Sequence, residues 1–266
     1  MHGSLLEGED DPVIMVNAES NSPFVLVCEH AGRRIPKSLG ALGLAQAELT
    51  RHIAWDIGAE AVARRVADLL GAPLVLQRYS RLVYDCNRPP DSADAIPAVS
   101  ELTPIPGNQK LDPESRLSRI EAIYRPFHTR LAALLDLRAV RGISSILVTI
   151  HSFTPVYKGV RRALDVGILH DHDRRFADVL FSRLSEIQTL VVRRNEPYGP
   201  KDGVCHTLNL HASIRGLRCA MIEIRNDLIA QETGAKEWSD RLAGVLRQAI
   251  QGESGSTQGQ MARAAG

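Results

Sequence analysis

The stretch SILVTIHS, residues 145–152, decides the fold. Residues 146–150 are apolar or β-branched, so this segment predicts a strand that is buried on both faces, as in a parallel sheet covered by helices. His151 and Ser152 follow this run directly. Ligands in open α/β sheets collect beyond the carboxyl ends of the strands, so the same stretch also indicates where a site is expected.

Similar apolar runs recur along the chain and alternate with longer helical patterns. The predicted strands are residues 24–28, 73–76, 145–150, 166–169, 189–192 and 219–224. The predicted helices, which carry apolar residues at a spacing of three to four, are 57–70, 113–140, 173–187 and 235–251. Strands that alternate with amphipathic helices are typical of the α/β class, in which helices connect the strands of a sheet.

The chain of 266 residues is expected to form one domain between two irregular ends. Residues 1–22 are acidic and polar, and we expect a loosely ordered lead-in there. From 252 to 266 the sequence is mostly Gly, Ser, Gln and Ala, which predicts a flexible tail. Residues 23–251 then form the single α/β domain. Within it, residues 87–110 contain five prolines and no helical or strand period. They predict a long loop that acts as a lid or binding loop, with disorder as the competing interpretation.

Composition narrows the class of function. With 32 Lys and Arg against 31 Asp and Glu, the net charge is +1, which argues against nucleic acid as a partner. The N-terminus lacks the order of a signal peptide and no apolar run reaches membrane-spanning length, so we expect a cytoplasmic protein, either a monomer or a homodimer, that does not bind membranes. The four cysteines stand singly, without CxxC pairs, and are interpreted as reduced thiols.

Two histidines and a carboxylate at the ends of different strands are the main candidates for chemistry. His30 follows the first predicted strand, His151 follows the third, and Glu223 lies in the last. Such residues can converge into a catalytic zinc site, in which about three protein ligands leave one position open. For each histidine alone, a structural role is the simpler interpretation. Asp56 is either a helix cap or a metal ligand. Glu29 is a rival ligand, although neighbours on a strand point to opposite faces.

A second polar cluster, residues 78–89, is rich in groups that recognise carboxylates. Arg81 and Arg88 are candidates for holding an acidic substrate, because a guanidinium binds a carboxylate in a bidentate manner. The alternative is a structural ion pair between Asp85 and one of these arginines. His170 and His172, in the run HDHD, form another metal candidate on paper, but they lie where a strand gives way to a helix. We favour a structural interpretation for that pair.

The chain resembles the N-formylglutamate amidohydrolase family, whose fold is similar to that of the zinc carboxypeptidases and aspartoacylases. The motifs that carry the resemblance are VLVCEHAG at 25–32, IP at 35–36, WDIG at 55–58, YSR at 79–81, DCNRP at 85–89, YRPFH at 124–128, IHS at 150–152 and IEIRND at 222–227. They occur in the family's order. The resemblance implies a three-layer architecture, with a mixed, mostly parallel sheet and helices on both faces, as in phosphorylase/hydrolase-like folds.

The resemblance also implies roles for individual residues. His30 and His151 would bind zinc with Asp56 as the third ligand, and Glu223 would be the general base. The residues expected to bind substrate are Arg81, Asn87, Arg88, His128 and Arg225. For His128, a solvent-facing position on a helix is the simpler guess. Zinc carboxypeptidases use an HxxE element, whereas Arg33 stands three residues after His30. The third ligand is therefore the point at which this chain departs from that pattern.

The activity implied is hydrolysis of the N-formyl, or another N-acyl, amide of an acidic amino acid such as N-formylglutamate, a reaction of histidine catabolism. Ser80 and Ser152 lack a GxSxG context, which argues against a serine hydrolase. Two alternatives stay open. One is a hydrolase of another N-acyl amino acid or a peptide-like amide, and the other is a non-catalytic binder of an acidic metabolite on the same fold.

Overall fold

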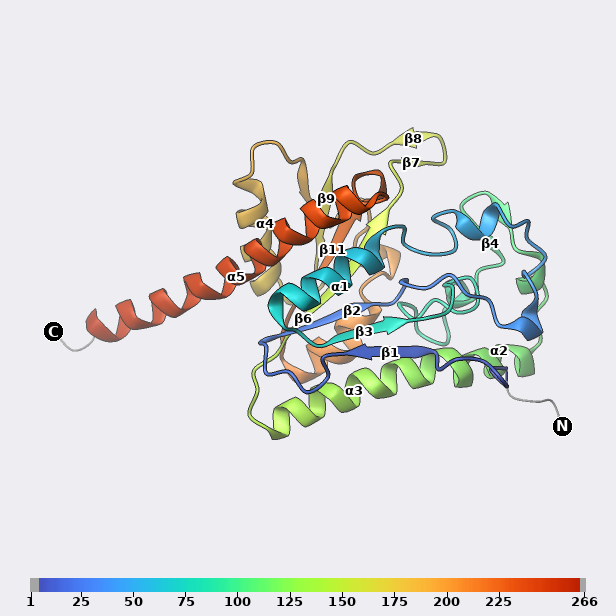
Figure 1. Cartoon of the computed structure of the whole chain (residues 1–266), viewed down its shortest axis with the longest axis horizontal. Coiled ribbons are helices and arrows are strands. Elements are labelled where there is room, and N and C mark those ends of the chain that lie inside the picture. The colour runs from blue at the N-terminus through green and yellow to red at the C-terminus, as the bar shows by residue number, and fades with distance from the viewer. Residues whose placement is uncertain (1–4, 264–266) are drawn as a thin grey trace.

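A seven-stranded mixed sheet forms the centre of the molecule, and the computed structural model describes residues 5–263 (Figure 1). Its strands are β1 (Val13–Val16), β2 (Phe24–Cys28), β3 (Leu74–Gln77), β6 (Ile146–Phe153), β9 (Val166–Leu169), β10 (Val192–Arg194) and β11 (Arg218–Arg225). The spatial order is β1-β3-β2-β6-β11-β9-β10. Strands β3, β2, β6 and β11 run parallel, while β1 and the β9–β10 pair run against them.

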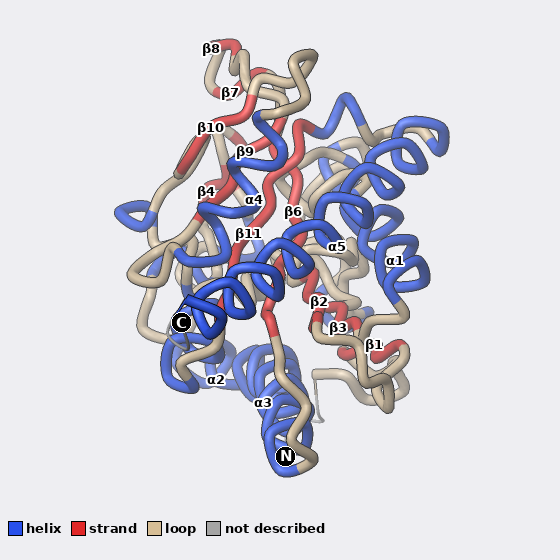
Figure 2. Tube along the Cα trace, turned by 90° about the vertical axis from the view of Figure 1, so that its left-hand side faces the viewer, coloured by secondary structure: helices blue, strands red, loops and turns tan. Residues whose placement is uncertain are grey.

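Helices cover both faces of this sheet (Figures 1 and 2). One face carries α1 (Ala59–Leu70), α4 (Arg175–Ser185) and α5 (Glu232–Arg263). The other face carries α3 (Arg125–Val140), which α2 (Pro113–Arg119) precedes across a π-helical turn, Ile120–Tyr124. The predicted three-layer, mostly parallel α/β architecture is confirmed.

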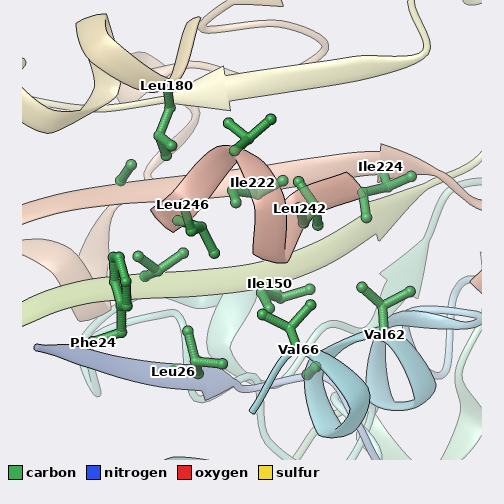
Figure 3. Packing of buried hydrophobic residues seen from close by; sticks show 14 of the residues in the cluster. Phe24, Leu26, Val62, Val66, Ile150, Leu180, Ile222, Ile224, Leu242 and Leu246 are labelled. Carbon is green, nitrogen blue, oxygen red and sulfur yellow. The ribbon is translucent and has the colours of Figure 1, made fainter. Parts of the chain in front are cut away.

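The apolar residues of the central strands separate into two cores, because successive side chains on a strand point to opposite faces. Figure 3 shows the core beneath α1, α4 and α5, where the labelled side chains are Phe24, Leu26, Val62, Val66, Ile150, Leu180, Ile222, Ile224, Leu242 and Leu246. On the other face, Val25, Leu147 and Met221 pack with Phe127 and Leu131 of α3. Burial of each such large side chain contributes about 1.5–3 kcal/mol, so these cores fix the strand positions on which the site depends.

The elements differ from the sequence-based expectation mainly at the two ends. Strand β1 lies inside the segment expected to be loosely ordered, because its run VIMV pairs with β3 at the sheet edge. Helix α5 begins at Glu232 and continues to Arg263, where a flexible tail was expected from residue 252. No proline interrupts that segment, so nothing in it forbids the helical backbone. Strand β10 begins at Val192, where the predicted strand ended.

Two small hairpins were also not foreseen. One, formed by β4 (Val99–Ser100) and β5 (Thr103–Pro104), lies within the proline-rich loop, which is ordered and anchored by Asn108 and the buried Arg119. The other consists of β7 (Val156–Tyr157) and β8 (Val160–Arg161) and projects beyond the sheet (Figure 1). Within residues 5–263, no helix combines the length and apolar character needed to cross a bilayer.

Candidate metal and catalytic site

Three residues from separate segments meet at the carboxyl ends of β2 and β6. His30 lies just after β2, Asp56 just before α1, and His151 within β6, and all three side chains are buried. Asp56 Oδ2 lies 2.9 Å from His151 Nδ1 and 3.3 Å from His30 Nδ1, and the two Nδ1 atoms are 3.2 Å apart. The ligand-type atoms of these three residues all lie within 4.8 Å of one another.

The backbone brings these side chains together through the pairing of β2 with β6 and a close turn after β2. Asp56 donates its backbone N–H to the carbonyl of His30 at 3.0 Å, which ties the segment before α1 to the end of β2. Gly32 packs so tightly there that a Cβ atom would lie 1.8 Å from the carbonyl oxygen of Arg78. Only glycine permits this approach, so the turn depends on a residue that carries no chemistry itself.

A buried carboxylate lies beside the far nitrogen of each imidazole, through a hydrogen bond between His30 and Asp85 and an ion-pair contact between His151 and Glu29. Asp85 Oδ1 lies 2.7 Å from His30 Nε2, and Glu29 Oε2 lies 3.0 Å from His151 Nε2. When Nε2 carries the proton, Nδ1 presents its lone pair, which is how carboxylates orient metal-binding histidines. Two ring nitrogens and a carboxylate oxygen then converge as three acceptors. A divalent cation satisfies all three together, and this donor set suits zinc.

Geometry separates the two candidates for the third ligand. The structure brings Asp56, rather than Glu29, to the two Nδ1 atoms. Strand β2 ends at Cys28, so the strand alternation that weighed against Glu29 no longer applies. Glu29 instead contacts the opposite nitrogen of His151. Asp56 is therefore the carboxylate that this geometry offers beside the two imidazoles, while Arg33 stacks on Trp55, 5.2 Å from the ring centroid.

Charges around the three residues favour ionised carboxylates. Burial acts to raise the pKa of Asp85, but the positive charges of Arg81 and His30 outweigh it and hold this pKa well below its ordinary value. For Asp56, burial is likewise outweighed by His30 and His151, and the pKa is lowered. Burial also opposes ionisation of Glu29, yet the charge of His151 and its contact lower the pKa to about 2.

Glu223 behaves differently from these carboxylates. It lies on β11 directly opposite His151 on β6, is 5% exposed, and its Oε2 has no hydrogen-bond partner among the described residues. Burial raises the pKa of Glu223 to about 7, and the negative charge of Asp56 acts in the same direction against the lowering effect of His151. A carboxyl group with a pKa near neutrality can both accept and release a proton.

The site opens into a cavity of about 670 Å³, a volume suited to a small ligand. The sequence-predicted residues that line it are His30, Asp56, Arg81, Asn87, Arg88, His151 and Glu223. Asp94, Ser100 and Glu101 of the proline-rich loop also line it. That loop therefore forms one wall of the cavity, and its role as a lid or binding loop stays a prediction.

Arg81 and Asn87 reach the cavity while they hold other parts of the site. Arg81 donates to Asp85 at 2.6 Å and to Asp56 at 3.3 Å, so the ion pair proposed for Asp85 exists. Asn87 accepts from Thr207 N at 3.1 Å and donates to Val204 O, which fixes the segment opposite the loop. Both side chains are thus already oriented before a ligand arrives.

The structure does not bring His128 and Arg225 to the cavity. His128 is buried rather than solvent-facing; it donates Nε2–H to the carbonyl of Cys86 at 2.8 Å and contacts His211 Nε2 through Nδ1. Arg225 forms ion pairs with Asp165 and Asp227. Neither belongs to the cavity lining among the described residues. These internal partners leave no geometric support for their expected contact with substrate.

Other expectations are settled by position. The side chain of His172 is 87% exposed, and His170 contacts the neighbouring backbone carbonyl of Asp171, so this pair does not share a binding point. The four cysteines are buried and unpaired. Sequence reasoning named Glu29 as a rival ligand and Asp85 as an ion-pair partner of an arginine, but it missed their contacts with the imidazoles of His151 and His30. It also missed Arg162 and Tyr198 in the cavity wall, for which the sequence offers no signal.

The chain is similar in sequence and in fold to known proteins. Residues 22–230 match the family model described as N-formylglutamate amidohydrolase. A crystal structure of a gene product from Agrobacterium tumefaciens is similar, with 48% sequence identity, a TM-score of 0.91, and coverage of 93% of this chain and 98% of that one. The N-formylglutamate amidohydrolase from Ralstonia eutropha shares the fold, with 21% identity, a TM-score of 0.69, and coverage of 92% and 100%. No curated protein is significantly similar in sequence.

Proposed function

Because the chain belongs to the N-formylglutamate amidohydrolase family and is therefore a hydrolase of amide bonds, we propose that it removes the N-formyl or another N-acyl group from an acidic amino acid such as N-formylglutamate, using a zinc ion. The observation that carries the proposal is the meeting of His30, Asp56 and His151 beside Glu223. This combination supplies a cation site and a proton carrier at the end of one cavity.

The proposed reaction needs an activated water molecule and stabilisation of an oxyanion. His30, Asp56 and His151 would hold the zinc ion, which when bound would supply Lewis acidity for activation of the water and polarisation of the amide carbonyl. Glu223 accepts the proton of the attacking water and passes it to the leaving amine nitrogen, a role worth about 10²–10⁴-fold in rate. Its pKa of about 7 suits both directions of transfer.

Arginines provide the remaining charge. Arg81, fixed by Asp56 and Asp85, contributes positive charge at the end of the cavity where the oxyanion develops. Arg88 donates to the carbonyls of Asn87 and Gly203, and it forms no ion pair within residues 5–251. Its positive charge is therefore free to hold a substrate carboxylate. Arg88 would orient the amino acid so that its acyl group points toward Glu223.

Two substitutions test the proposal. Glu223→Gln should keep zinc binding and lose most turnover of N-formylglutamate, because the amide cannot carry the proton. His151→Ala should lose zinc, whereas His172→Ala, an exposed histidine, should keep both zinc and activity. Metal content by elemental analysis and release of glutamate report the two properties separately. Wild-type turnover in Glu223→Gln would remove this residue as the base.

The same measurements distinguish the alternatives. Comparison of N-formyl and N-acetyl amino acids by rate identifies the acyl group and the amino acid that the cavity prefers. A protein that binds N-formylglutamate with zinc present but releases no product would be a binder rather than an enzyme. We infer turnover, because ligand binding alone requires neither a group of candidate metal ligands nor a carboxyl group with a raised pKa whose Oε2 has no hydrogen-bond partner among the described residues.

A further inference from the structure

Arg162, at the end of the β7–β8 hairpin, is held by three aromatic rings in the wall of the cavity. Its guanidinium carbon lies 4.5 Å from the ring centroid of Tyr157, 4.8 Å from that of Tyr198 and 5.8 Å from that of Phe153. Nη1 also donates to the hydroxyl of Tyr198 at 3.0 Å. Rings that cover the guanidinium leave its N–H edges free for in-plane hydrogen bonds, so Arg162 is oriented for a planar anion.

The positive charge of Arg162 has no carboxylate partner within residues 5–251. Its hydrogen bonds within this range all come from Nη1, to Tyr198 and, at 3.5 Å, to the carbonyl of Thr154, so Nε and Nη2 make none there. Arg225, by contrast, is neutralised by Asp165 and Asp227. An arginine that is fixed by aromatic rings and yet unpaired is suited to bind an anionic group of a ligand.

Arg162 and Tyr198 lie in the same cavity as the proposed reaction site. Both residues line the cavity that contains the three candidate metal ligands and Glu223. Burial raises the pKa of Tyr198, the negative charge of Glu223 acts in the same direction, and the positive charge of Arg162 acts against it. Tyr198 is thus within electrostatic reach of both groups. A ligand in the cavity can therefore touch Arg162 at one end while its amide lies near Glu223.

The cavity contains a second unpaired guanidinium, that of Arg88, and the two differ in position. Arg88 is three residues from Asp85, which contacts His30, whereas Arg162 follows a hairpin that projects beyond the sheet (Figure 1). In an N-acyl amino acid, the α-carboxylate is attached to the carbon next to the amide nitrogen. The side-chain carboxylate is attached further from the amide, and the cavity offers two arginines, one for each carboxylate.

We propose that Arg162 binds the side-chain carboxylate of the substrate and thereby makes this hydrolase selective for dicarboxylic N-acyl amino acids. This inference rests on the proposed function, because it concerns the substrate of the same site. The rings of Tyr157, Tyr198 and Phe153 hold the guanidinium in place before substrate enters, which reduces the entropy lost on binding. Arg162 is a specificity residue and takes no part in proton transfer.

The test compares N-formylglutamate with N-formylglutamine, which differ only in the charge of the side-chain end. Arg162→Met should lower kcat/KM for N-formylglutamate by about tenfold or more, since a charge pair is lost, and should change the value for N-formylglutamine less than threefold. Arg161→Met is the matched control, because Arg161 is exposed and outside the cavity lining, and it should change neither value. An equal loss for both substrates, or an unchanged ratio, overturns the assignment.

Folding and turnover are controlled separately. Arg162→Lys keeps the charge but loses the planar fork, so it should retain part of the preference for N-formylglutamate if Arg162→Met does not fold. Should the wild-type protein hydrolyse neither compound, the proposed function fails, and calorimetric binding still tests Arg162. The wild type should then bind N-formylglutamate more tightly than N-formylglutamine, and Arg162→Met should remove that difference. Equal binding of both by the wild type refutes the inference.

Discussion

Replacement of Asp85 by asparagine is the sharpest test of how the imidazoles are held for zinc. Asp85 Oδ1 lies 2.7 Å from His30 Nε2 and accepts from Asn87 N at 2.9 Å, and its Oδ2 accepts from Arg81 at 2.6 Å. Asparagine has nearly the same shape but no charge, and its amide group cannot accept from both His30 and Arg81. The change therefore weakens the orientation of His30 without opening a cavity.

The size of the effect follows from the bonds that change. A hydrogen bond to a charged group contributes about 1.5–3 kcal/mol and a neutral one about 0.5–1.5 kcal/mol, so the support of His30 weakens by about 1–1.5 kcal/mol. Since about 1.4 kcal/mol corresponds to a tenfold change in a binding constant, zinc affinity should fall about tenfold. That value is the lower end of the range of about 10–100-fold found for partners behind metal ligands.

The assay is competition for zinc between the purified protein and a chromophoric chelator at neutral pH. Asp165→Asn is the matched control, because Asp165 also forms an ion pair with an arginine, Arg225, at 3.0 Å but lies outside the cavity lining. Both variants lose an ion pair, and only Asp85→Asn should lose zinc affinity. If Asp85→Asn binds zinc as tightly as the wild type, or if Asp165→Asn weakens it equally, the carboxylate does not orient His30 for the metal.

Three further changes test the neighbouring features. Glu29→Gln should lower zinc affinity about tenfold through its ion-pair contact with His151. Glu60→Gln, a change at a half-buried residue of α1 outside the cavity lining, should not; equal affinities of the two variants would refute the role of Glu29. Gly58→Ala should destabilise the fold by more than about 2 kcal/mol in denaturant unfolding, because φ is +80° and the new Cβ would lie 2.2 Å from Ile229 O. Gly71→Ala, with φ +57° and open space, should cost only about 1 kcal/mol; similar losses in both would contradict the close contact. Burial lowers the pKa of His128 from 6.5 to about 4, so at acidic pH the unfolded chain binds a proton more readily than the folded protein. The free energy of unfolding should therefore fall by up to about 3 kcal/mol as the pH falls from 6.5 to 4. That slope should shrink in His128→Gln and persist in His172→Gln.

Hydrophobic pattern was sufficient to place most of the sheet. Strands β2 and β9 begin and end where their apolar runs do, because their buried faces leave little freedom in register. Strand β1 was not predicted, because its four apolar residues lie between acidic segments and acquire a strand conformation only by pairing with β3. Strand β10 was misplaced because the apolar run before it precedes the residues that pair with β9. Partners distant in sequence decide both cases.

Candidate site residues were predictable where a strand delivers them and unpredictable where a loop does. His151 and Glu223 lie on neighbouring parallel strands, opposite one another in register, so the pattern of β6 and β11 locates them. Arg162 comes from a two-stranded hairpin and meets Tyr198 from the segment after β10. Nothing in the local sequence of either segment indicates that Arg162 and Tyr198 touch, because their contact depends on how the two segments are placed in the fold.

The two carboxylates that contact the imidazoles, Glu29 and Asp85, come from different segments than the histidines they contact. This arrangement explains why the candidate site depends on the sheet. Glu29 is the chain neighbour of His30, yet it holds His151 on β6, while Asp85 from a different segment holds His30. A displacement at the end of β2 therefore moves the candidate ligand His30 together with Glu29, the carboxylate that contacts His151. Since β2 and β6 are fixed by two cores on opposite faces, packing far from the cavity sets the distance between the two Nδ1 atoms. No single segment supplies both a candidate ligand and the carboxylate that contacts it. A change in one segment should therefore disturb all three candidate ligands together.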